Sequence, residues 1–74
     1  MDTSYFTIVE TGQPLDHGLR MWTHERSARL FASETYEVWN AGRMITRPVM
    51  LCRDNMAIDC FEGHWMSGYV LEDD

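Results

Sequence analysis

Two cysteines and a histidine are the residues whose types and spacing could do chemistry. Cys52 and Cys60 flank a charged turn, and His64 follows shortly after. A hairpin that brought the two Cα atoms within about 7 Å would permit a disulfide, although cytosolic thiols normally stay reduced. A structural zinc site needs four ligands, and these residues match no common Cys-x2-Cys spacing. His17 or His24 would have to supply the fourth ligand.

Catalysis by the same residues would need Cys60, His64 and Asp59 to meet in one cleft. Neighbouring residues of a strand point to opposite faces, so Asp59 and Cys60 would diverge. The acid pair Asp59 and Glu62 lacks an apolar pocket that would separate its pKa values. Because free cysteine is often buried as a small hydrophobic residue, we prefer that interpretation. We expect no enzyme, no metal and no cofactor, and a small thiol-based or metal-binding enzyme is the third hypothesis.

The sequence pattern predicts that these residues are positioned by the strands and helix of a small α+β fold. Alternation and β-branched or aromatic residues indicate strands over 4–10, 19–22, 43–46, 48–52, 56–61 and 64–72. The turn-forming residues of 11–18 and 53–55 predict a loop and a turn. A helix should begin at Thr23, a suitable N-cap. We therefore expect one domain over residues 1–74, with an antiparallel sheet of four to five strands packed with one main α-helix.

The length of that helix has two interpretations. Glu25 and Arg29 form a supportive i,i+4 pair at its start. We prefer a helix that ends at Ser33 and is followed by a strand over 35–39, because residues of high β-propensity are concentrated there. The alternative is one helix that continues to Asn40, since apolar residues also recur at helical spacing.

Charge and composition narrow the classes of partner. Twelve acids against six bases give a net charge of −6, and all six bases are arginine. Such a chain is repelled by nucleic-acid phosphate, so we expect no direct nucleic-acid binding and favour a protein partner with a basic surface. The longest apolar run is four residues, over 49–52, and the first ten residues lack the pattern of a signal peptide. We expect a cytoplasmic protein without membrane contact.

The surplus of aromatic residues, methionine and arginine is typical of interface centres. We expect exposed acids, assisted by two aromatic side chains, to bind the partner. These residues are Asp54, Asp59, Glu62, Glu72, Asp73, Trp65 and Tyr36. The function that we expect is a non-enzymatic inhibitor that docks on the basic, nucleic-acid-binding surface of a host protein complex and blocks it as a nucleic-acid mimic. The alternative is a homodimeric accessory or structural domain.

Small size, acidity, the absence of a catalytic motif and the absence of lysine are similar in general character to phage-encoded anti-defence proteins, including anti-CRISPRs. This likeness is one of character, and no motif of the sequence places the chain in such a family. It implies a defence complex that binds nucleic acid as the partner, and the host cell cytoplasm as the location.

Overall fold

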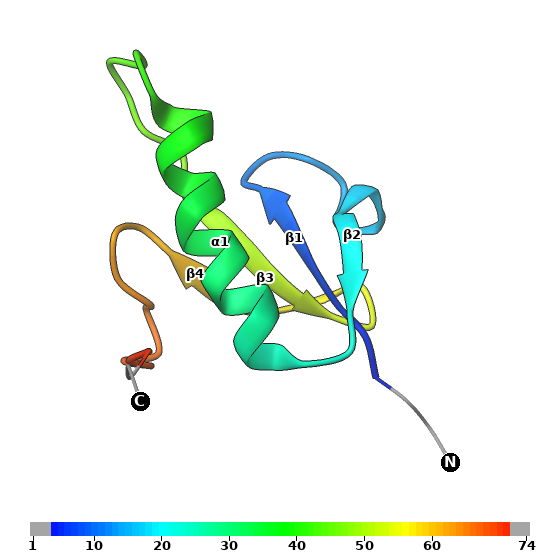
Figure 1. Ribbon diagram of the computed structural model, residues 1–74. Coiled ribbons are helices and arrows are strands. Elements are labelled where there is room, and N and C mark those ends of the chain that lie inside the picture. Colours follow the sequence, from blue (N-terminus) through cyan, green and yellow to red (C-terminus); the bar gives the residue numbers. More distant parts are fainter. Residues whose placement is uncertain (1–3, 72–74) are drawn as a thin grey trace.

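One α-helix lies across one face of a four-stranded antiparallel sheet (Figure 1). The computed structural model describes residues 4–71, apart from the side chains of His17, Leu19 and Arg20. Its elements, in chain order, are β1 (Phe6–Glu10), η1 (Leu15–His17), β2 (Leu19–Trp22), α1 (Glu25–Asn40), β3 (Val49–Arg53) and β4 (Met56–Phe61). The strand order is β2-β1-β3-β4, and every neighbouring pair is antiparallel. The predicted α+β fold is confirmed.

The core lies between α1 and the two central strands. Alternate residues of β1 and β3 turn toward the helix, and Ile8, Val49 and Leu51 have no exposed surface. Ala28 and Ala32 of α1 are equally buried, because their small side chains let the helix approach the sheet closely. The core therefore depends on a few fully buried residues, as expected for so short a chain.

The other face of β1 is covered by the segment that connects β1 to β2. Thr7 and Val9 point away from the helix and are still only 4% and 2% exposed. Gly18, which follows η1, lies against them: a Cβ atom on Gly18 would stand 2.6 Å from the Cβ of Thr7. The close approach requires glycine, and it explains why β1 is buried on both faces.

The helix is longer than the preferred prediction. It runs from Glu25 to Asn40, so the expected end at Ser33 and the expected strand over 35–39 are wrong and the long-helix alternative is confirmed. Thr35 is buried on the helix face that meets the sheet, and that burial outweighs the β-propensity of the segment. The helix begins one residue later than expected, with His24 as the N-cap residue.

The β3–β4 hairpin turns at Asp54 and Asn55, which both have positive φ, as a two-residue turn requires. The predicted strands over 48–52 and 56–61 are confirmed as β3 and β4. Cys52 faces Ala57 beside this turn, and a register shift between Leu51 and Cys52 places Cys60 opposite Met50. The two cysteines are therefore not cross-strand partners, and both are free.

Two further predicted strands are wrong. Residues 43–46 form an irregular loop, and residues 64–71 form no strand beyond a single bridge between Phe61 and Trp65. Residue 72, the predicted end of the last strand, lies outside the described residues. The chain after β4 instead turns back beside it, where Met66 N–H donates to the Cys60 carbonyl at 2.9 Å. The single α-helix of the described residues is too short and too polar to span a membrane.

Candidate partner-binding surfaces

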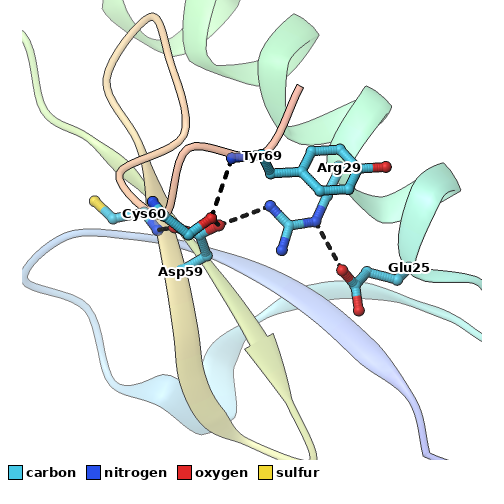
Figure 2. Close-up of polar contacts among 6 residues, drawn as sticks. Glu25, Arg29, Asp59, Cys60 and Tyr69 are labelled. Atoms are coloured by element: carbon cyan, nitrogen blue, oxygen red, sulfur yellow. Dashed lines mark hydrogen bonds and ion pairs between the residues drawn. The ribbon is translucent and has the colours of Figure 1, made fainter. Parts of the chain in front are cut away.

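A buried ion pair joins the helix to the sheet and to the segment that follows β4. Arg29 of α1 donates from Nη1 to Asp59 Oδ2 at 2.7 Å and from Nε to Glu25 Oε2 at 2.9 Å (Figure 2). Its guanidinium lies 4.0 Å from the ring centre of Tyr69 and 4.5 Å from that of Trp65. The side chains of Arg29 and Asp59 are 7% and 2% exposed, so the pair is almost dry.

Asp59 satisfies its carboxylate with four donors. Besides Arg29, it accepts from the backbone N–H groups of Cys60 and Ser67, at 2.8 and 3.1 Å, and from the Ser67 hydroxyl. Burial alone would raise the pKa of Asp59, but these hydrogen bonds outweigh it and lower the pKa below its ordinary value. The carboxylate is thus fully used within the fold, and it fixes the segment that carries Trp65 and Tyr69.

This geometry corrects two of the expected binding residues. Asp59 was expected on the surface because aspartate is mostly exposed, but Arg29 compensates its charge inside. Trp65 was expected as an accessible anchor, but it is 3% exposed and belongs to the core. The expected exposure of both residues is therefore wrong, and their part in binding stays a prediction.

The other expected residues lie apart from one another. Asp54 and Glu62 are exposed, the first in the β3–β4 turn and the second beyond the other end of β4. Tyr36 is half-buried, and its ring centre lies 5.4 Å from that of Phe61 in an edge-to-face arrangement. Glu72 and Asp73 lie outside the described residues. Binding by these residues stays a prediction, and the structure does not gather them into one patch.

Two arginines pair with carboxylates of the fold itself. Arg29 holds Asp59 and Glu25, and Arg43 pairs with Glu10. Four exposed acids form no ion pair anywhere in the part of the chain that the structure describes. They are Glu34, Glu37, Asp54 and Glu62. These four carboxylates therefore stay unneutralised at the described surface.

Glu34 and Glu37 were missed by sequence reasoning, because their segment was assigned partly to a strand. On the observed helix they share the outward face of α1 with two exposed apolar side chains, Leu30 at 48% and Val38 at 72%. The helical periodicity was the signal that could have found them. Beside this face lies a shallow apolar groove of about 300 Å³, which we call the α1 groove. It is lined by Phe31, Glu34, Thr35, Val38 and Trp39.

The two thiols are protonated hydrophobic groups rather than reactive ones. Cys52 has no exposed surface, and burial raises its pKa. Burial also raises the pKa of Cys60, as do the nearby carboxylates of Glu62 and Asp59. The interpretation of Cys52 as a buried small hydrophobic residue is confirmed. Among the side chains that the structure describes, which do not include that of His17, no three or more His, Cys, Asp or Glu are grouped as metal ligands would be.

A second hollow, of about 430 Å³, lies on the sheet face away from the helix. Cys60 lines it together with Met50, Ile58 and Met66.

The chain matches no protein-family model, no curated protein and no solved structure. Its function is therefore argued from its own side chains.

Proposed function

We propose that this protein is a non-enzymatic inhibitor that docks its outward carboxylates on the basic, nucleic-acid-binding surface of a protein complex and blocks that surface. The observation that carries the proposal is a set of exposed carboxylates that no arginine of the described chain neutralises. Arg29 and Arg43 are engaged with inner or neighbouring carboxylates, whereas Glu34, Glu37, Asp54 and Glu62 face outward without an ion pair in the described chain.

Electrostatics makes such a surface effective against a cationic partner. A net charge of −6 on 74 residues attracts a basic surface over distance and raises the association rate. The exposed Leu30 and Val38 lie among the acids of α1, so docking there would also bury apolar surface. Carboxylates in the place of phosphates would then compete with nucleic acid for the same arginines and lysines of the partner.

The chemistry of the buried groups supports a binding role over catalysis. Asp59 is held by four donors, which leaves no lone pair directed at a substrate. The raised pKa of Cys60 keeps its thiol protonated near neutral pH, and the protonated form is a poor nucleophile. The proposed inhibitor is of the phage-encoded anti-defence type and would act in the cytoplasm of the host cell.

The experiment is affinity capture from host-type lysate at low and high salt, with a competition step. The wild-type bait should retain a nucleic-acid-binding complex that added DNA or RNA displaces. A variant that combines Glu34→Gln, Glu37→Gln, Asp54→Asn and Glu62→Gln should lose it. The matched control, Arg47→Gln with Arg53→Gln, should retain it. Capture that is insensitive both to nucleic acid and to the four neutralised acids would contradict the proposal.

A homodimeric accessory domain is the second candidate. The exposure of large apolar side chains in the loop after α1 favours it: Met44 is 100% exposed and Ile45 82%. Sedimentation of the protein without any partner tests this candidate, because an accessory homodimer needs no foreign protein to assemble. A protein that stays monomeric would exclude it.

A further inference from the structure

The loop 41–48, which we call the finger, extends past the C-terminal end of α1 before the chain returns to β3 (Figure 1). It carries Met44 and Ile45, two consecutive large apolar side chains that are almost completely exposed. Single exposed apolar residues are common on protein surfaces, but an adjacent pair at the tip of a projecting loop is the arrangement of a docking element.

The finger is held rigidly at its base by Asn40, which is 8% exposed. The Asn40 amide donates to the carbonyls of Tyr36 and Arg47, at 2.9 and 3.0 Å, and its oxygen accepts the Arg47 N–H at 2.6 Å. Gly42 has φ of +79°, a conformation that favours glycine at the bend. A pre-ordered loop loses little entropy on binding, so its apolar side chains can contribute most of their burial to affinity.

The finger is cationic on an otherwise acidic protein. Arg43 is already paired with Glu10, but Arg47 is exposed and its guanidinium has no ion pair among the described side chains. A surface that fits the finger must therefore offer an apolar recess with a carboxylate beside it.

The α1 groove of the protein itself has both properties. Phe31, Val38 and Trp39 supply apolar walls, and Glu34 stands in the lining without an ion pair in the described chain. Its volume of about 300 Å³ is that of a shallow recess for a few apolar side chains. The finger and the groove are thus complementary in polarity and in charge.

Symmetry allows two copies to make this contact twice. The groove lies on α1 and the finger extends past the C-terminal end of α1, so a two-fold axis between them, with the two α1 helices antiparallel, brings each finger to the other copy's groove. We propose that the protein forms a symmetric homodimer in which Met44 and Ile45 of one copy enter the α1 groove of the other, with Arg47 paired to Glu34. The proposal rests on the homodimer candidate above, and its contact would occupy Glu34 and Val38 of the α1 face.

The net charge of −6 opposes the approach of two copies, and the Arg47–Glu34 pairs place opposite charges at the contact. The β3–β4 turn with Asp54 lies at the end of the hairpin away from the finger and stays exposed in this dimer (Figure 1).

The test is sedimentation equilibrium of the purified full chain, from about 1 µM to about 1 mM, where weak dimers dissociate. Wild-type protein should dimerise. Met44→Ser and Ile45→Ser should each weaken the dimer by about tenfold or more, since both remove a buried anchor. Met56→Ser, which truncates a 69% exposed methionine at the other end of the sheet, is the matched control and should leave the dimer unchanged.

A charge-reversal cycle tests the pairing itself. Arg47→Glu alone and Glu34→Arg alone should each weaken the dimer, and the double variant should recover it, because the opposite charges are restored in exchanged places. A wild type that stays monomeric would overturn this proposal and the homodimer candidate together. A dimer that the finger variants leave unchanged, or a double variant that does not recover, would overturn the finger contact and leave the homodimer candidate standing. A confirmed dimer would cover Glu34 and Val38, and the inhibitor proposal would then depend on Glu37, Asp54 and Glu62.

Discussion

Asp59→Asn is the substitution that most sharply tests how the fold is held together. It keeps the size of the side chain and removes its charge. An asparagine can present its oxygen to only one side of the site, so its NH₂ group would face either the Arg29 and Ser67 side chains or the two backbone N–H donors. The NH₂ group cannot accept from Arg29 or from the backbone N–H groups, whereas the Ser67 hydroxyl can turn and accept from it, so one or two of the four hydrogen bonds are lost. Arg29 keeps only Glu25 as its anionic partner.

The expected loss of unfolding free energy is about 3–5 kcal/mol. Each hydrogen bond to a charged group contributes about 1.5–3 kcal/mol, and breaking a buried ion pair by removing one partner costs about 3–5 kcal/mol. A chain of 74 residues has a total stability of roughly 4–11 kcal/mol, so the variant should be close to unfolding at room temperature.

The assay is urea denaturation, followed by circular dichroism, at a series of pH values. The lowered pKa of Asp59 means that its contribution is fully present above the ordinary value of 3.8 and is lost as the pH falls through the lower value of the folded state. The difference between wild type and variant should therefore be largest near neutral pH and shrink in acid. Glu37→Gln, which neutralises an exposed acid, should change stability by less than about 0.5 kcal/mol. A loss below about 1 kcal/mol for Asp59→Asn would refute the role assigned to the buried pair.

Three further predictions concern the thiols, the packing behind β1 and the base of the finger. Cys60 and Cys52 should react slowly with a disulfide reagent near neutral pH, because both have raised pKa values, and rapidly once the protein is unfolded; fast native reaction would contradict this. Gly18→Ala should lower the free energy of unfolding by about 1–3 kcal/mol and shift the denaturation midpoint to lower urea, since the new methyl group would overlap Thr7. An unchanged midpoint would contradict the close contact. Asn40→Ala should cost about 2–3 kcal/mol and speed amide exchange in the finger, and unaltered exchange would show that the loop is ordered by other contacts.

The sequence predicted all four observed strands and the start of the helix, but it also predicted strands over 35–39, 43–46 and 64–72 that the described residues do not form. Alternation over 6–10 and 56–61 was strong enough to place β1 and β4, and the residues 53–55 correctly indicated the turn. The segment 35–39 satisfied both a strand and a helix pattern. Only the burial of Thr35 against the sheet decides between them, and that contact is tertiary.

The candidate site was less predictable because exposure depends on partners distant in sequence. Asp59 is thirty residues from Arg29, and no local sequence pattern predicts that the two side chains form an ion pair. The tight turn at Asp54 and Asn55 pairs Cys52 with Ala57, and only a longer loop would have let Cys52 face Cys60. Trp65 became a core residue because Asp59 fixes the chain that carries it.

The salt dependence of the affinity between the captured complex and the protein tests the central claim most directly. It should be compared between the wild type and the variant that neutralises Glu34, Glu37, Asp54 and Glu62. If outward carboxylates dock on a basic surface, the wild-type affinity should fall steeply as salt rises, and the variant should bind weakly at every salt concentration. Equal affinities for the two proteins, with no dependence on salt, would contradict the account.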